Sequence, residues 1–203
     1  MNTRPEFATR SSLTQVPPQI YYVHPLMLKG IDAWREVFAH VRDLGFDTVL
    51  SAPLFLRGQN ASVFVTRNFD ELDPIYGLGS SLDEGIRSLV AAASEHGIKL
   101  MLDLVIDRVA VEPGHASPAV ADPRIAPIES CSRRIDFMSE ARHIEDWRAR
   151  MVRLSSLGIA GFRCLGIARL AREAWYELIL ATRSAAPDTT FLAWTPGTSF
   201  EDR

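Results

Sequence analysis

The chain has 203 residues, of which 47% are hydrophobic and 23% are charged, the composition of an ordinary globular protein. Its formal net charge of -3 gives no electrostatic basis for binding nucleic acid or an anionic membrane. No apolar run reaches the roughly 18 residues that a membrane span needs, and the N-terminus has no signal-peptide core. The two cysteines form neither a disulfide framework nor a CxxC zinc pair. We therefore expect a cytoplasmic protein without a metal or another cofactor.

Local patterns divide the chain into a flexible arm, residues 1–18, and one domain over residues 19–203. The arm is polar and has no hydrophobic periodicity. The domain begins with a β-rich segment that predicts a strand ending at Pro25. Apolar residues at helical spacing then predict a helix that stops at Gly45, and a second buried strand follows up to Pro53.

A long connection, residues 55–81, comes next, and its length suggests a functional loop. Ser81 and Glu84 form a capping-box pattern at the start of a helix that ends at Gly97. The near-continuous apolar segment 98–107 predicts a parallel strand that is buried on both faces.

The last third of the chain continues the alternation of strands and helices. Residues 111–134 are rich in Pro, Ala and Ser and predict an irregular excursion. A helix over residues 139–158, a strand over 159–165, a helix over 168–187 and a strand over 189–194 follow. This order predicts an α/β fold with a parallel sheet and helical crossovers. Nucleotide-binding versions of the fold have no support, because neither GxGxxG nor a P-loop is present.

Five ordered motifs resemble those of the α-amylase superfamily, glycoside hydrolase family 13. They are GFDTVLSAPLF, DELDPIYG, GIKLMLDLVIDRVA, LGIAGFRCL and FLAW, and the resemblance runs from about residue 20 to residue 200. GFRC and FLAW are most similar to the maltosyltransferase branch, which extends α-glucans. The resemblance implies a (β/α)8 TIM barrel of which the first five β/α units are present, with its site at the carboxyl ends of the strands.

The family's chemistry is retaining glycosyl transfer between two carboxyl groups that lie ~5 Å apart. Carried over position by position, the nucleophile falls on Leu165 and the acid on Trp194. The asparagine and histidine of the third-strand motif fall on Asp107 and Arg108, and a third acid would lie after the last residue. Leucine cannot form a glycosyl ester and tryptophan cannot protonate a glycosidic oxygen. The resemblance therefore implies a pseudoenzyme with residual α-glucan (maltooligosaccharide) binding or a partner role.

Six residues are candidates for binding substrate, and each has a structural alternative. Asp103 and Arg163 keep the family's identities but are expected to pair with each other. Trp194 suits either sugar stacking or plugging of the emptied site. Tyr76 and Phe64 lie on the long connection and suit either sugar stacking or anchoring of the loop. His24 is a candidate because it ends the first strand.

Two other interpretations stay open. An active glucan hydrolase or maltosyltransferase could use relocated acids, with Asp103, Asp107, Asp70 and Asp73 as candidates. Alternatively, the chain is a non-functional N-terminal fragment of a longer glycosyltransferase or hydrolase. Five strands do not close an eight-stranded barrel and leave two strand edges unpaired. We therefore expect self-association or a second chain that completes the barrel.

Overall fold

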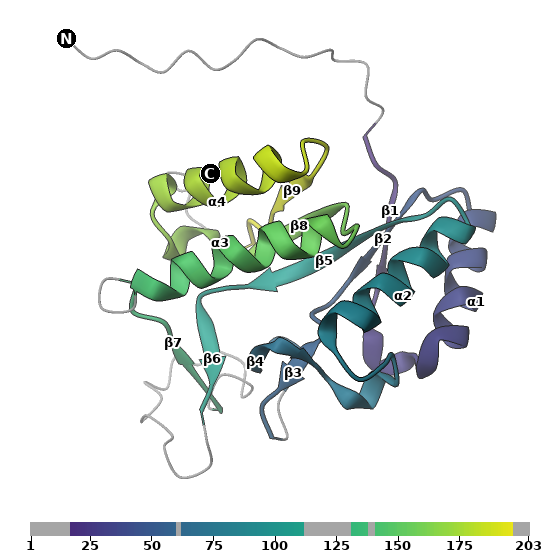
Figure 1. Cartoon of the computed structure of the whole chain (residues 1–203), viewed down its shortest axis with the longest axis horizontal. Helices are drawn as coiled ribbons and strands as arrows, with labels where there is room; N and C mark the ends of the chain where they lie inside the picture. The colour runs from purple at the N-terminus through teal and green to yellow at the C-terminus, as the bar shows by residue number, and fades with distance from the viewer. Residues whose placement is uncertain (1–16, 60–61, 112–130, 138–140, 197–203) are drawn as a thin grey trace.

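The computed structural model describes residues 17–59, 62–111, 131–137 and 141–196, and a five-stranded parallel sheet forms its centre (Figure 1). The strand order equals the chain order, so each crossover adds the next strand on the same side, as in a barrel. Most of the predicted arm lies outside the described residues. The strands are β1 (Ile20–Val23), β2 (Thr48–Ser51), β5 (Lys99–Val105), β8 (Gly161–Leu165) and β9 (Thr190–Ala193).

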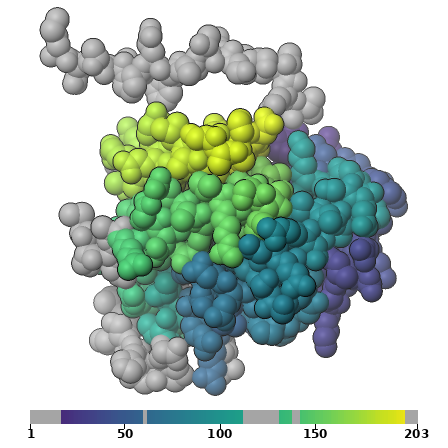
Figure 2. Space-filling model, viewed as in Figure 1, coloured from purple at the N-terminus to yellow at the C-terminus, as the bar shows by residue number. Residues whose placement is uncertain are grey.

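Four helices follow the strands and pack in two pairs, α1 beside α2 and α3 beside α4. In Figure 2 the outer surfaces of α3 and α4 lie side by side, with α4 along the edge of the molecule. Among the described residues, no helix combines the length and the apolar character that crossing a membrane requires. The helices are α1 (Gly30–Asp43), α2 (Leu82–Glu95), α3 (Ala141–Ser156) and α4 (Arg172–Ala185), with 3-10 turns η1 (Pro25–Met27), η2 (Pro74–Tyr76) and η4 (Ile167–Arg169).

Both predicted helix signals are present in the structure. Gly45 follows α1 with a φ of 87°, the left-handed conformation that glycine adopts without a Cβ penalty. The Ser81 hydroxyl caps α2 by accepting a hydrogen bond from the Glu84 amide at 3.3 Å. The Glu84 carboxylate, however, accepts hydrogen bonds from Ser80. The reciprocal half of the predicted capping box is thus shifted by one residue.

Alternating side chains give the sheet two different faces. One face packs against the helices and forms the hydrophobic core, with Leu100, Leu102 and Leu104 of β5 and Phe162 of β8. The other face carries the charged and aromatic side chains that are described in the next section. The chain thus buries an apolar face against helices and keeps its polar chemistry for the concave face of the sheet.

The predicted loop over residues 55–81 contains an antiparallel hairpin. Its strands are β3 (Phe55–Arg57) and β4 (Thr66–Leu72), and their pairing includes register shifts. A second antiparallel pair joins β6 (Arg108–Ala110) to β7 (Ser132–Arg134), so the predicted irregular excursion includes a strand; residues 112–130 lie outside the described residues. These short strands are largely polar and lack hydrophobic alternation. Pairing with their partner strands stabilises them.

The β3–β4 hairpin is fixed to α3 by aromatic packing and by an ion pair. The ring of Phe69 lies 4.9 Å from that of Trp147, centroid to centroid, and the ring of Phe55 lies 6.2 Å from it. The Arg150 guanidinium donates to the Asp70 carboxylate from Nη2 at 2.7 Å. Contacts of this kind give the connection a fixed position beside the carboxyl ends of the strands.

Candidate functional site

Asp103 of β5 and Arg163 of β8 are register partners near the carboxyl end of the sheet. Arg163 Nε donates to Asp103 Oδ1 at 2.6 Å, and Arg163 Nη2 donates to Oδ2 at 2.7 Å. Asp103 has no solvent-exposed surface, so this bidentate pair compensates for the burial of its charge. The predicted ion pair is therefore confirmed.

Two aromatic rings hold the Arg163 guanidinium from different strands. Its Cζ atom lies 4.8 Å from the centroid of Tyr22 on β1 and 4.6 Å from that of Trp194, which follows β9. Both aromatic residues are 42% exposed. Because β1 and β9 are the two edges of the sheet, these contacts require strong curvature. We call Tyr22, Asp103, Arg163 and Trp194 the strand-end cluster.

The electrostatics of the strand-end cluster follow from burial and from the ion pair. Burial raises the pKa of the Asp103 carboxyl, and the hydrogen bonds from Arg163 oppose this rise. Burial acts to lower the pKa of the Arg163 guanidinium, but its pairing with Asp103 raises that pKa overall. Burial, followed by the Asp103 charge, raises the pKa of the Tyr22 hydroxyl. The cation thus stays charged and committed to its carboxylate partner.

Cys164, which follows Arg163 on β8, has a buried side chain. Burial, with a smaller contribution from the Asp103 charge, raises the pKa of its thiol to about 12. The thiolate is the nucleophilic form of cysteine, and at neutral pH this position holds the thiol. Cys164 therefore serves as a small apolar side chain of the core.

Leu165 stands at the last position of β8, where the family resemblance places the nucleophile. It is the register partner of Val105, so two apolar residues face each other at the strand ends. Gly166 follows with a φ of 66°, and a Cβ atom there would lie 3.0 Å from the Asp107 carboxylate. The turn therefore brings Asp107 close to the backbone after β8, while the position of Leu165 offers no polar atom.

Three other candidate residues, Tyr76, Phe64 and His24, are not members of the strand-end cluster. Tyr76 is fully buried and its hydroxyl donates to the Pro53 carbonyl at 3.4 Å. Sugar stacking needs an exposed ring face, so the burial of Tyr76 favours the loop-anchoring alternative. Phe64 is half-buried in the hairpin loop, and His24 is half-buried just after β1. For these two the binding role stays a prediction.

Each of the four relocated-acid candidates pairs with a different arginine. Asp103 pairs with Arg163, as described above. The other three pairs have distances of 3.3 Å, 2.7 Å and 2.7 Å and are Asp107–Arg108, Asp73–Arg57 and Asp70–Arg150. A general acid needs a carboxyl group that stays protonated near neutral pH. Hydrogen bonds from Arg150 hold the pKa of Asp70 below its ordinary value, and, against the effect of burial, hydrogen bonds from Arg57 and backbone amides do the same for Asp73. None of these ion pairs resembles the two facing carboxyl groups of a retaining enzyme.

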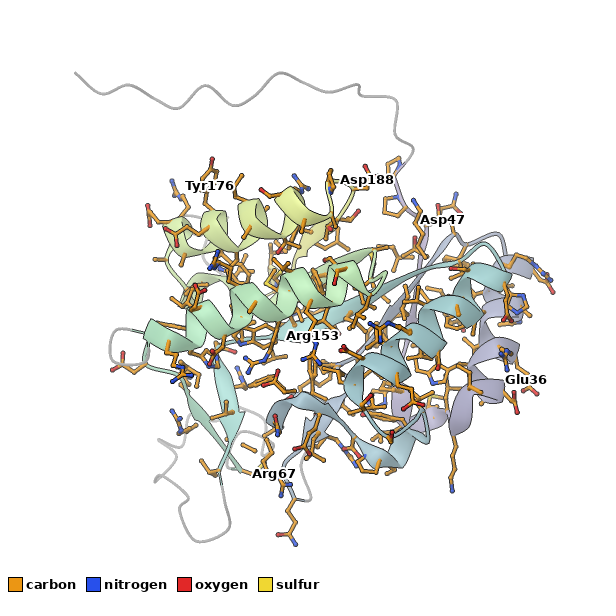
Figure 3. All side chains as sticks on the ribbon, in the orientation of Figure 1. Glu36, Asp47, Arg67, Arg153, Tyr176 and Asp188 are labelled. Atoms are coloured by element: carbon orange, nitrogen blue, oxygen red, sulfur yellow. The ribbon has the colours of Figure 1, made fainter. Side chains whose placement is uncertain are left out.

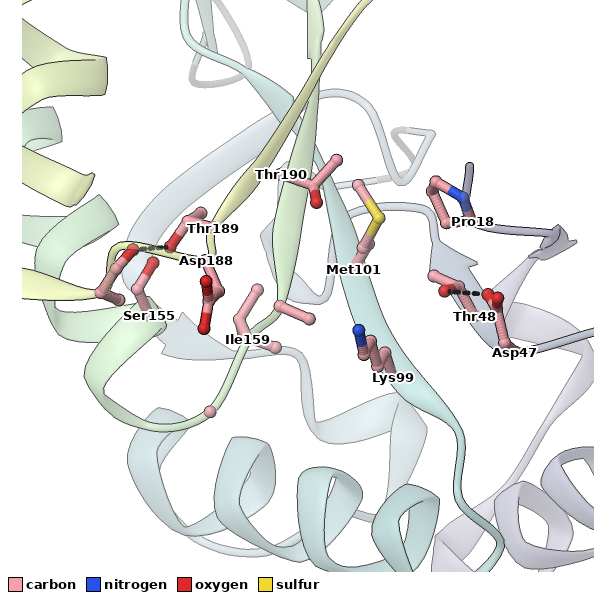
Figure 4. A pocket seen from close by; sticks show the side chains of 13 residues that line it. Pro18, Asp47, Thr48, Lys99, Met101, Ser155, Ile159, Asp188, Thr189 and Thr190 are labelled. Carbon is pink, nitrogen blue, oxygen red and sulfur yellow. Dashed lines mark hydrogen bonds between the residues drawn. The ribbon is translucent and has the colours of Figure 1, made fainter. Parts of the chain in front are cut away.

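A hollow lies at the opposite end of the sheet (Figure 4). It encloses about 550 Å³ and is lined by residues at the amino ends of the strands, among them Thr48, Lys99 and Thr190. Asp188 and Met101 also line it. In barrel folds this end is associated with stability and the carboxyl end with chemistry. Within the described ranges, no group of three or more His, Cys, Asp or Glu side chains could hold a metal ion.

Sequence reasoning missed Tyr22 as a member of the strand-end cluster. Its signal was the aromatic pair Tyr21–Tyr22 on a strand, which puts one ring on each face of the sheet. Tyr21 packs against the helix-side core, so Tyr22 lies on the concave face. The contact with Arg163 depends on sheet curvature, which the sequence pattern does not give.

The fold and the positions at the strand ends define a parallel α/β domain of the barrel type, with candidate site residues at its carboxyl edge. The family described as alpha amylase, catalytic domain, matches residues 28–126. The alpha-1,4-glucan:maltose-1-phosphate maltosyltransferase of Burkholderia pseudomallei (strain K96243) is 29% identical over 214 residues, which cover 97% of this chain and 18% of that protein.

Solved structures with this fold are also amylases and related enzymes. An alpha-amylase from Lactobacillus plantarum has a TM-score of 0.71 at 19% identity and covers 87% of this chain and 44% of its own. A debranching enzyme from Nostoc punctiforme has a TM-score of 0.69 at 16% identity, with 91% and 49% covered. In sequence and in fold, the chain is therefore similar to the alpha-amylase superfamily, glycoside hydrolase family 13. It spans less than half the length of each of these relatives.

Proposed function

We propose that this chain is a non-catalytic member of its family that binds α-glucan at the strand-end cluster. One observation carries the proposal: Trp194 stacks on Arg163 at the strand ends, and Leu165 and Trp194 stand where the motif resemblance places the nucleophile and the acid. An arginine beside a nucleophilic carboxylate would be drawn towards it. Here the guanidinium binds Asp103 and two aromatic rings instead, an arrangement without a reacting group.

The ion pairs support the absence of catalysis. Retaining transfer needs one carboxylate to attack the anomeric carbon and one carboxylic acid to protonate the leaving oxygen. Asp103, Asp107, Asp70 and Asp73 are each engaged by an arginine. A carboxylate whose oxygens accept hydrogen bonds from an arginine is held in place and cannot turn freely towards a sugar. The relocated-acid alternative therefore has no geometry in its favour.

The exposed aromatic rings support residual glucan binding. Trp194 and Tyr22 each keep 42% of their surface exposed at the carboxyl edge, and the apolar faces of glucose rings pack on such rings. A related structure, the alpha-amylase of Geobacillus thermoleovorans, was solved complexed with acarbose. On this chain, we infer that a maltooligosaccharide would lie across the exposed faces of Trp194 and Tyr22. The affinity should be low, because only two half-exposed rings contribute to the platform.

The experiment combines a product assay with a binding assay on the same full chain. Maltoheptaose is incubated with the protein, with and without maltose 1-phosphate, and the oligosaccharide lengths are measured by ion chromatography. Tryptophan fluorescence is then titrated with maltoheptaose, with cellooligosaccharides as the stereochemical control. We expect unchanged lengths and a saturable response to the α-linked sugar. Chain lengthening or shortening, or an equal response to both sugars, would contradict the proposal.

Variants assign the response to the strand-end cluster. Trp194→Ala should remove the saturable response, because it deletes one ring of the platform. Leu44→Ala is the control, since Leu44 is a 53% exposed apolar residue at the end of α1. A Trp194→Ala protein that binds as tightly as the parent would place any glucan site elsewhere.

A further inference from the structure

The outward face of α4 carries a regular stripe of four exposed side chains. They are spaced by three, four and three residues, and they lie opposite the buried Leu178 and Thr182 of the same helix. Figure 3 shows Tyr176 pointing away from the body of the molecule. The members of this α4 stripe are Glu173, Tyr176, Leu180 and Arg183.

The centre of the α4 stripe is apolar where a solvated helix face is normally polar. Tyr176 is 61% exposed and Leu180 is 53% exposed, and residues four apart on a helix are neighbours. The two therefore form one contiguous apolar patch. The core face of α4 already buries other residues, so this patch has no role in the packing of the helix onto the sheet.

The ends of the α4 stripe carry opposite charges that lack ion-pair partners. No described cation pairs with Glu173, and no described carboxylate pairs with Arg183. Arg183 Nε donates to the Thr189 carbonyl at 3.2 Å, and its guanidinium lies over Phe191. These contacts involve no anion. The charges are too far apart along the helix to pair with each other.

We propose that the α4 stripe is a self-association surface through which two copies pair with antiparallel α4 helices. A two-fold axis beside the middle of the helix brings residue 173 opposite residue 183 of the second copy, and residue 176 opposite residue 180. Glu173 then meets Arg183, and Tyr176 meets Leu180, on both sides of the axis. The spacing of three and four residues is that of a coiled-coil seam, which suits helices packed in this way.

The charge order selects a second copy as the occupant. A two-fold interface uses the same patch on both chains and must be self-complementary. The α4 stripe meets this condition in the antiparallel arrangement, whereas a parallel one would place Glu173 against Glu173 and Arg183 against Arg183. The helix is about 21 Å long. Such a short seam gives a small interface, so the dimer should be weak and concentration-dependent.

Sedimentation velocity of the full chain over a wide concentration range tests the proposal. The dimer fraction should rise with concentration. Leu180→Glu should weaken dimerisation by roughly a hundredfold, because it buries two carboxylates without partners. The control is Leu44→Glu, since Leu44 has the same 53% exposure but lies at the end of α1. A chain that stays monomeric, or a dimer that tolerates Leu180→Glu, would overturn the proposal.

Charge reversal tests the two-fold arrangement itself. Glu173→Arg and Arg183→Glu should each weaken the dimer roughly tenfold, and the double variant should recover the parent affinity. Association through the open edges of β1 and β9 would leave all three variants unaffected, and that result would also overturn the proposal. The glucan site lies on the concave face, so these variants leave the fluorescence response to maltoheptaose unchanged.

A cross-linking measurement covers the case in which Arg183→Glu fails to fold. In a Cys131→Ser background, chains with Tyr176→Cys are mixed with chains with Leu180→Cys under oxidising conditions. The mixture should form interchain disulfides, whereas each variant alone should not, because only the mixed pair brings the two Cα atoms within bonding reach. Equal cross-linking in all three samples, or none in the mixture, would overturn the antiparallel arrangement.

Discussion

The β3–β4 hairpin and the strand-end cluster both follow the carboxyl ends of parallel strands, yet they keep the family's residues to different degrees. The hairpin leads into Asp73, Pro74, Tyr76 and Gly77, the stretch that resembles the family's aspartate-proline-x-tyrosine-glycine motif. Its aromatic anchors, Phe55, Phe69 and Tyr76, are buried in the core. The strand-end cluster keeps only the supporting ion pair, and Trp194 stands where the resemblance places an acid.

This difference separates the residues that position a site from the residues that react in it. Buried anchors are maintained by the free energy of folding, because their loss leaves cavities or unpaired charges. A reacting carboxylate at a strand end contributes little to folding, so the proposed function, with Leu165 and Trp194 at the family's acid positions, requires little loss of stability.

The largest effect is expected when the hairpin's aromatic anchor is removed. Trp147 is fully buried and its ring packs against Phe69 and Phe55. Trp147→Ala should lower the free energy of unfolding by about 3–5 kcal/mol through the lost burial and the cavity left behind. Urea denaturation followed by circular dichroism measures this change. A loss similar to that of an exposed control, Leu44→Ala, would contradict the buried position of the anchor.

Breaking the ion pair of the strand-end cluster should have the next largest effect. Arg163→Ala leaves the fully buried Asp103 carboxylate without its cation and should destabilise the fold by about 3 kcal/mol. Asp103→Leu combined with Arg163→Met should recover most of that loss, because it removes both charges. The same denaturation assay compares the variants. If Arg163→Ala proves neutral, the pair does not stabilise the fold across β5 and β8.

The ion pair of the hairpin motif should make stability depend on acid pH. Burial acts to raise the pKa of Asp73, but Arg57 and two backbone amides lower it overall from its ordinary value of 3.8. A lowered folded pKa stabilises the fold above that ordinary value, and the contribution is lost as pH falls through the folded pKa. Asp73→Asn should therefore flatten the acid limb of the unfolding free energy. An unchanged acid limb would mean that Asp73 is not paired in solution.

The smallest effect on stability is expected at Trp194. Trp194→Ala removes a half-exposed ring and one cation-π contact, so the free energy of unfolding should change by less than about 1 kcal/mol. Thermal melting of the variant beside the parent protein measures this change. A loss as large as that of Trp147→Ala would show that Trp194 plugs the structure and acts as a core residue.

The sequence predicted the five parallel strands and four helices because strong periodicity and glycine stops marked them. It also predicted the Asp103–Arg163 pair, since strand-end residues of neighbouring parallel strands lie side by side. The hairpin was missed because the segment of β4, TRNFDEL, is polar and gains its strand conformation from pairing with β3. Local patterns do not report pairing that tertiary contacts create.

The composition of the candidate site was only partly accessible from the sequence. Tyr76 was a candidate for sugar stacking or for loop anchoring, and its buried position in the folded connection favours anchoring. Tyr22 joins Arg163 from the far edge of the sheet, and only the curvature of the sheet brings them together. The assignment of Leu165 and Trp194 to the nucleophile and acid positions came from motif resemblance, which compares the order of residues along the chain.

A two-dimensional amide NMR titration of the full chain with maltoheptaose tests the central claim most directly, because one sample reports both binding and turnover. We expect saturable shifts of the Trp194 indole signal and of amides around Arg163, while the anomeric proton signals of the sugar stay unchanged over days. New anomeric signals would show an active glycosidase or transferase. An indole signal that ignores the sugar, in a well-dispersed spectrum, would contradict glucan binding at the strand-end cluster.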